Sequence, residues 1–121
     1  MVGEKGKILV VDDEHLVRWS VCRFLEGEGF TVLEASSGPE ALQFLQNEDI
    51  WILITDLMMP VMDGVELIRQ ARIQDPDLTI FVITAVDSPG PVHSAREAGA
   101  MRTFTKPIPF DDLVGTIQRM V

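Results

Sequence analysis

The stretch WILITDLMMPVMDG, residues 51–64, joins a short apolar run directly to a carboxylate, Asp56. A continuous apolar run of this length is typical of a parallel strand that is buried on both faces of a sheet. An ionised side chain at the end of a buried strand is costly unless hydrogen bonds or an opposite charge compensate it. The sequence therefore predicts that other parts of the chain bring compensating groups to Asp56.

Similar apolar runs alternate with amphipathic stretches along the whole chain. Strands are predicted over residues 7–11, 31–35, 51–55, 79–84 and 103–105. Helices are predicted over residues 14–28, 37–47, from 65 to just before 75, 91–98, and from 110 to 117. A strict alternation of strand and helix predicts an α/β fold with a parallel sheet and helices on both faces. We therefore expect one domain, residues 1–121, built as a doubly wound (βα)5 three-layer sandwich.

Polar side chains follow the predicted strands at the points where these strands end. They are Asp12, Asp13, Glu14, Asp56, Thr84, Thr105 and Lys106. In doubly wound sheets, ligands bind beyond the carboxyl ends of the strands. Carboxylates gathered at one edge repel each other unless a cation lies among them. Oxygen ligands without a nearby His or Cys favour a hard divalent ion, above all Mg²⁺.

Lys106 adds a positive charge to this edge, and Thr84 adds a hydroxyl donor. A metal ion, an ammonium and a hydroxyl are suited to phosphoryl transfer, in which a carboxylate can itself be the nucleophile. Each of these residues, taken alone, also has an ordinary structural role. The Asp pair can satisfy a helix N-terminus, the hydroxyl can bond to the main chain, and the lysine can be a solvated surface charge. Their joint placement at the ends of different strands favours a phosphoryl site.

The chain resembles the CheY-like receiver domains of two-component response regulators. The resemblance is carried by VVDDE (10–14), DLMMPVMDG (56–64), ITA (83–85), GA (99–100) and TKPI (105–108), in that order. It implies a flavodoxin-like parallel five-stranded sheet in the order 2-1-3-4-5. It also implies a cytoplasmic protein that catalyses only its own phosphorylation and dephosphorylation.

The resemblance assigns roles to the site residues. Asp56 would accept a phosphoryl group from a sensor histidine kinase or a phosphotransfer protein. Asp12, Asp13, Asp56 and the main-chain carbonyl of Met58 would hold Mg²⁺. Thr84 and Lys106 would bind the phosphoryl oxygens, and Pro107 would follow a cis peptide bond. The further partner would be an output domain or a second receiver.

The chain departs from the family pattern at two places on its signalling surface. Thr103 stands where the family carries an aromatic residue, while Phe104 is expected to face the core by strand alternation. The connection VDSPGP (86–91) holds two prolines and is expected to shorten the following helix. One hypothesis is that the signal uses Thr84 and the 86–91 loop. A second is that Met58 and Val86 shield an acyl phosphate from water.

Several other residues carry expectations that the structure can test. Gly64 is expected to allow a positive φ in a rigid loop after the acceptor, with the loop methionines filling gaps. Trp19 is expected to be at least partly exposed and is a candidate docking residue, whereas Trp51 is expected to pack at the amino edge of the sheet. The single cysteine, Cys22, excludes an internal disulfide.

The composition of the chain argues against several classes of function. A net charge of −9 argues against direct nucleic-acid binding, and no apolar run is long enough to insert into a membrane. The amino-terminal stretch has no apolar core typical of a signal peptide. Two other classes compete with a phosphoacceptor: a receiver-like interaction module that works without phosphorylation, and a phosphatase or other Mg²⁺-dependent phosphotransferase. The latter would need a general acid and a substrate-covering domain.

Overall fold

The computed structural model describes residues 6–85 and 88–121, in which strands and helices alternate. The strands are β1 (Lys7–Val11), β2 (Val32–Ala35), β3 (Ile50–Thr55), β4 (Thr79–Thr84) and β5 (Arg102–Thr105). The helices are α1 (His15–Gly27), α2 (Gly38–Asn47), α3 (Gly64–Gln74), α4 (Pro89–Ala98) and α5 (Phe110–Gln118). No helix in these ranges is long and apolar enough to cross a membrane.

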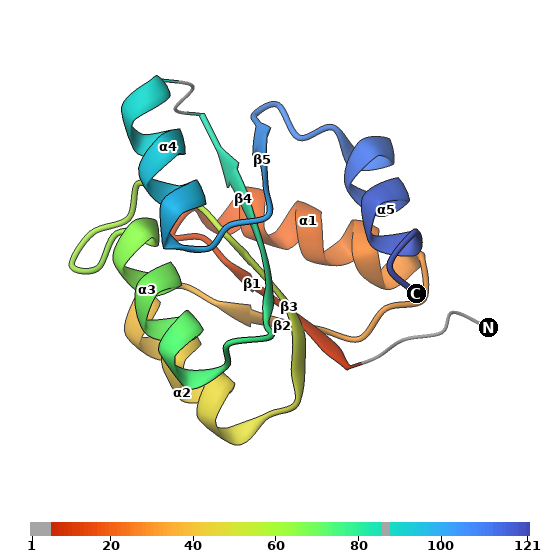
Figure 1. The fold of residues 1–121 in the computed structure, drawn as a ribbon. Helices are drawn as coiled ribbons and strands as arrows, with labels where there is room; N and C mark the ends of the chain where they lie inside the picture. The colour runs from red at the N-terminus through yellow and green to blue at the C-terminus, as the bar shows by residue number, and fades with distance from the viewer. Residues whose placement is uncertain (1–5, 86–87) are drawn as a thin grey trace.

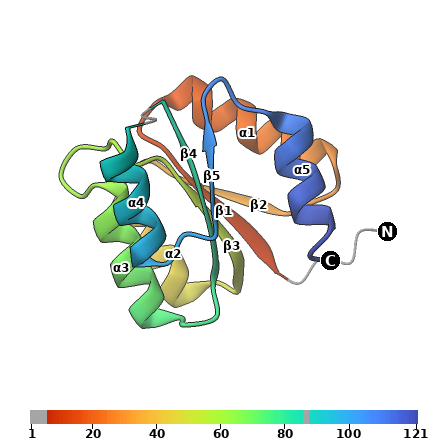
Figure 2. The same ribbon diagram turned by 45° about the horizontal axis from the view of Figure 1, so that its top comes forward.

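The strands form one parallel sheet in the order β2-β1-β3-β4-β5, which confirms the expected topology. Helices α1 and α5 cover one face of the sheet, and α2, α3 and α4 cover the other (Figure 1). Figure 2 shows the sheet between these two helical layers. The chain leaves β1 toward one edge of the sheet and continues from β3 toward the other. The switch in strand order therefore lies between β1 and β3.

Strand alternation divides the buried side chains into two cores. Leu9 and Val11 of β1 point into the core beneath α2, α3 and α4. Ile8 and Val10 of the same strand point into the core beneath α1 and α5. Since both faces of the strand are covered, neither set of positions is free to be polar. This is why the central strands read as continuous apolar runs.

Helix α4 begins at Pro89, so the prediction of a shortened helix starting at residue 91 is wrong. Ser88 is its N-cap, and both Pro89 and Pro91 fall in its first turn. The N–H groups of a first turn have no partner within the helix, so proline loses no hydrogen bond there.

Two expectations about packing are confirmed, for Trp51 and Phe104. Trp51 packs against the core at the start of β3, with its ring 6.2 Å from that of Phe30. Phe104 is buried and meets Phe81 edge-on, with ring centroids 5.9 Å apart. Cys22 is fully buried in α1, and this burial raises the pKa of its thiol to about 12. The thiol therefore stays protonated, and so a poor nucleophile, at neutral pH.

Candidate functional site

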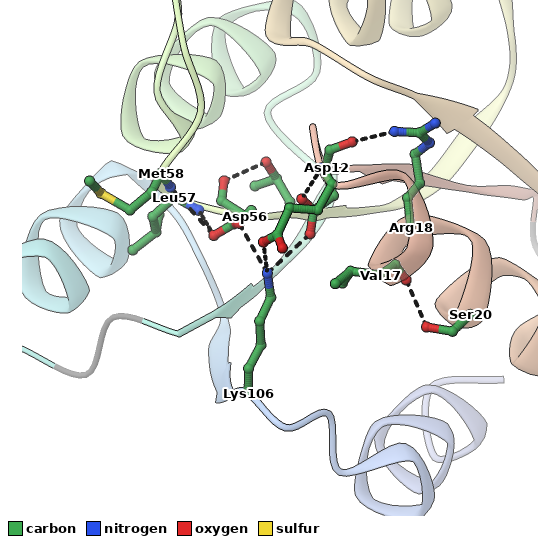
Figure 3. A network of polar contacts seen from close by, with 10 residues as sticks. Asp12, Val17, Arg18, Ser20, Asp56, Leu57, Met58 and Lys106 are labelled. Carbon is green, nitrogen blue, oxygen red and sulfur yellow. Dashed lines mark hydrogen bonds and ion pairs between the residues drawn. The ribbon is translucent and has the colours of Figure 1, made fainter.

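Main-chain hydrogen bonds bring three charged side chains to the carboxyl edge of the sheet. The parallel pairing continues one residue past the strands: the Asp12 N–H donates to the Ala35 carbonyl (3.2 Å), and the Asp56 N–H donates to the Val11 carbonyl (3.1 Å). The Lys106 N–H donates to the Thr84 carbonyl (2.8 Å). These bonds extend the sheet to Asp12, Asp56 and Lys106 and place their side chains beyond its edge (Figure 3).

The Lys106 ammonium supplies the compensating charge that was predicted for Asp56. Its Nζ lies 3.2 Å from Asp56 Oδ2, 3.3 Å from Asp12 Oδ2 and 3.2 Å from Glu14 Oε1. The Asp12 and Asp56 residues are only 4% and 5% exposed, whereas the Glu14 side chain is 62% exposed. The two buried carboxylates therefore share one cation, and Glu14 reaches it from the solvent side.

The second oxygen of each buried carboxylate is held by the main chain. Asp56 Oδ1 accepts hydrogen bonds from the N–H groups of Leu57 (2.7 Å) and Met58 (3.4 Å). Asp12 Oδ1 accepts from the Glu14 N–H at 2.9 Å. One oxygen is thus anchored in each case while the other faces Lys106 (Figure 3). This arrangement fixes both side chains with little rotational freedom.

The electrostatics of the site follow from burial and from the short distances. Burial, with the Asp56 charge adding to it, raises the pKa of Asp12, because Lys106 and the Glu14 N–H offset only part of the cost. Burial works to lower the pKa of Lys106, but the carboxylates of Asp12 and Asp56 outweigh it and raise that pKa. Lys106 therefore stays charged at neutral pH.

Asp13 completes an acidic cluster with the two buried carboxylates. One carboxylate oxygen each from Asp12, Asp13 and Asp56 lies within 4.8 Å of the others. All donors are oxygen atoms, and together they carry more negative charge than Lys106 neutralises. This donor set fits a hard divalent cation such as Mg²⁺ better than zinc or copper. Met58 lies directly beside the cluster, and its carbonyl stays a predicted ligand.

Thr84 is fully buried at the end of β4, in register with Thr105 of β5. The Lys106–Pro107 peptide bond is cis, as predicted. Val86, the second suggested water shield, lies outside the described residues, as does residue 87, and residues 89–91 of the suggested loop form the first turn of α4. The signalling hypothesis for that loop therefore stays a prediction.

The loop after β3 departs from expectation at Gly64, whose φ is not positive. A Cβ at Gly64 would lie 2.2 Å from the Asp56 carbonyl oxygen and 2.8 Å from the Leu57 Cα. Glycine is therefore needed for close approach of two backbone segments. The left-handed residue is Val61 instead, with a φ of 72° and a fully solvated side chain. Met59 is buried in the core, as expected of a gap-filling side chain.

Sequence reasoning missed one residue of the site, Arg18, and gave Glu14 no role. Arg18 lies on α1, and its guanidinium donates to the main-chain carbonyl of Asp12. No motif marks this contact, because it joins a helix side chain to a backbone atom. The i, i+6 spacing from Asp12 becomes informative only when the turn between β1 and α1 is known. Trp19, next to it, is about half exposed, as expected.

Comparison with known proteins places this site in a family. The model of the response regulator receiver domain matches residues 8–118. The response regulator MprA of Mycobacterium ulcerans is 38% identical over 95% of the chain. The chain spans about half the length of MprA, and a quarter to a half of the first curated relatives it matches.

Two solved structures extend the comparison to the fold. The chemotaxis protein CheY4 of Vibrio cholerae has a TM-score of 0.89 and 32% identity, with 98% of this chain and 100% of that chain covered. A response regulator from Burkholderia pseudomallei was solved with a phosphorylated aspartic acid, a calcium ion and citrate. It has a TM-score of 0.86 and 27% identity, with 92% of this chain and 65% of that chain covered. On the match to the family model, the identity to MprA and the shared fold, this chain is a member of the response regulator receiver domain family of two-component systems.

Proposed function

We propose that the domain accepts a phosphoryl group on Asp56 from the phosphohistidine of a sensor kinase or phosphotransfer protein. The observation that carries this proposal is the convergence of Asp56 with Asp12, Asp13 and Lys106 at the sheet edge. The Burkholderia pseudomallei relative, with its phosphorylated aspartic acid, supports the same chemistry. The domain modifies only itself and then presents a changed surface to a partner.

The chain's own groups account for most of the transfer. A carboxylate oxygen of Asp56 forms a bond to phosphorus while the bond from phosphorus to the donor imidazole nitrogen breaks. The Leu57 and Met58 N–H groups hold Oδ1 of Asp56, so that the side chain is presented in one orientation. Lys106, already 3.2 Å from Oδ2, neutralises charge on the phosphoryl oxygens. The Thr84 hydroxyl, at the end of the neighbouring strand, is proposed to donate to one of them.

We assign Mg²⁺ to the acidic cluster. Asp12, Asp13, Asp56 and the Met58 carbonyl would hold it, in keeping with the all-oxygen donor set. When bound, the ion supplies charge stabilisation for the transferring phosphoryl group.

The partner that receives the signal is proposed to be an output domain or a second receiver. The greater length of MprA is consistent with an additional domain in that relative. The usual aromatic switch is not available here, because Thr103 takes its place and Phe104 is packed against Phe81. We propose that Thr84 and the segment 86–91, which includes the first turn of α4, carry the conformational change.

The test of the proposed function is incubation with a small phosphodonor and Mg²⁺, followed by mass spectrometry. The expected product is one phosphoryl group on Asp56, absent when Mg²⁺ is chelated and absent from Asp56→Asn. No adduct on the wild type would favour the phosphorylation-independent interaction module. Rapid release of phosphate from an external substrate, without an adduct, would favour a phosphatase.

The phosphoryl lifetime gives a second prediction. Met58 lies two residues past Asp56, and its side chain is 63% exposed. Replacing this apolar side chain with a polar one should admit water to the acyl phosphate on Asp56. In Met58→Asn, this acyl phosphate should therefore hydrolyse several-fold faster than in the wild type. The measurement is loss of phosphoprotein with time after the donor is removed. Val61→Asn, which polarises a still more exposed residue of the same loop, is the control. An unchanged or slower rate in Met58→Asn would refute shielding.

A further inference from the structure

Arg18 links three elements next to the site. Its Nη1 donates to the Asp12 carbonyl at 2.6 Å, and its Nε donates to Glu34 Oε1 at 3.1 Å. Its Nη2 lies 3.1 Å from His15 Nδ1. The side chain is only 13% exposed, although it begins on a surface helix. Arg18 therefore ties the start of α1 and the edge strand β2 to the turn that follows β1. Figure 3 shows its contact with Asp12.

The accepting carbonyl belongs to the peptide unit between Asp12 and Asp13. It is the first carbonyl past β1, and the Asp12 N–H just before it makes the last hydrogen bond to the neighbouring strand β2. The orientation of this peptide unit fixes the direction in which the Asp13 side chain leaves the backbone. Without a donor, this carbonyl would turn toward solvent, and the backbone at Asp13 would gain freedom.

The two acidic residues depend on this contact to different degrees. The Asp12 carboxylate is held independently by the Glu14 N–H and by Lys106. The Asp13 side chain is exposed, and within residues 6–85 and 88–121 it has no hydrogen-bond partner of its own. Its position in the cluster therefore depends on its backbone. A disturbance of the Asp12–Asp13 peptide unit should fall mainly on Asp13.

We propose that Arg18 is a positioning residue for the divalent-cation site: by holding the Asp12 carbonyl, it aims the Asp13 carboxylate at the cation. This inference rests on the proposed function for its role in phosphorylation, but its effect on cation binding can be measured separately. Residues that orient metal ligands typically change affinity by about 10- to 100-fold when replaced. Because the contact acts through the main chain, we expect the lower end, roughly tenfold weaker Mg²⁺ binding in Arg18→Met.

Arg23 offers a matched control on the same helix. It pairs with Glu34 Oε2 at 3.8 Å and with Glu26, but it makes no contact with Asp12. Arg23→Met therefore removes one positive charge and a Glu34 partner without touching the peptide unit beside Asp13. Arg18→Lys keeps the charge but cannot bridge two acceptors with a planar fork, so it should fall between Arg18→Met and wild type.

The experiment is calorimetric titration of Mg²⁺ into the wild type and these three variants, with urea unfolding to measure stability. Mg²⁺ affinity should fall in Arg18→Met, fall less in Arg18→Lys and stay within about twofold in Arg23→Met. With a small phosphodonor, Arg18→Met should need more Mg²⁺ for half-maximal labelling but reach nearly the wild-type rate at saturation. A general loss of structure would instead lower that saturating rate.

Two results would overturn the proposal: equal Mg²⁺ affinity in Arg18→Met and wild type, or equal losses in Arg18→Met and Arg23→Met. If Arg18→Met does not fold, the same titration of Arg18→Lys against Arg23→Met decides. Failure of the proposed function would look different. Wild-type protein would then show no adduct on Asp56, whatever the Arg18 variants do to cation binding.

Discussion

Lys106→Met is expected to bind Mg²⁺ about tenfold more tightly than the wild type and yet to accept a phosphoryl group far more slowly. The Lys106 ammonium contacts Asp12 Oδ2 and Asp56 Oδ2, two of the carboxylates assigned to the cation. It therefore repels a divalent ion and competes with it for the same oxygens. Methionine keeps most of the side-chain length but removes both effects.

Phosphoryl transfer should fall because Lys106 is the only cation that contacts Asp56 in the described part of the chain. Removing one preorganised donor from a site of developing negative charge typically slows a reaction by about 10²–10³-fold. The measurements are calorimetric titration with Mg²⁺ and the rate of labelling by a small phosphodonor at saturating Mg²⁺. Without Mg²⁺, the variant should also unfold at a lower urea concentration than the wild type, because two buried carboxylates lose their cationic partner. Addition of Mg²⁺ should restore the lost stability.

Lys7→Met is the control, because Lys7 forms an ion pair with Glu48 at the opposite edge of the sheet. It removes one lysine and one ion pair but should change neither Mg²⁺ affinity nor labelling. Weaker Mg²⁺ binding in Lys106→Met would show that the lysine organises the carboxylates more than it competes with the ion. That outcome would contradict competition between Lys106 and Mg²⁺ for the same oxygens.

Gly64→Ala is expected to cause the largest structural damage of any single methyl group added near the site. The new Cβ would lie 2.2 Å from the Asp56 carbonyl oxygen, far inside contact distance, and the obstructing atom is backbone. The Gly64 N–H also donates to the Leu57 carbonyl at 2.9 Å, so the two segments cannot separate without losing that bond. Overpacking of this kind typically costs about 1–3 kcal/mol and occasionally more.

The damage should also slow phosphoryl transfer, because the obstructed carbonyl belongs to Asp56, the proposed acceptor. A displacement of about 1 Å can slow a positioned reaction by roughly 100-fold. Urea unfolding and phosphodonor labelling measure the two effects. Gly27→Ala is the control: nothing lies within 4 Å of its added Cβ, and it sits at the end of α1. An unfolding free energy of Gly64→Ala within about 0.5 kcal/mol of wild type would contradict the predicted clash.

Much of the fold was predictable because a strand that is buried on both faces of the sheet has a continuous run of apolar residues. Residues 8–11 and 79–84 are continuously apolar or β-branched, and both lie within strands. The site followed from the same pattern, since Asp12, Asp56 and Lys106 stand at the ends of such runs. The strand order was different: it came from the resemblance, because periodicity alone does not fix which strands are neighbours.

Features that depend on contacts between distant backbone segments were not predictable. Gly64 suggested a positive φ, because that is the commoner reason for glycine in a loop, and the approach of the Asp56 carbonyl has no sequence signature. Val61 takes the left-handed conformation although β-branched residues disfavour it. The predicted start of α4 was wrong because the sequence does not distinguish a proline before a helix from a proline in its first turn.

The long chain separation within the site has a consequence for its biosynthesis. Lys106 contacts Asp12 across 94 residues and Asp56 across 50. At about 5–20 residues per second, translation therefore adds Asp56 roughly 3–10 s before Lys106, and Asp12 roughly 5–19 s before it. During that interval the acceptor aspartate exists without its cationic partner and without β5 beside β4. The proposed phosphorylation of Asp56 therefore requires a chain that has been synthesised at least as far as Lys106.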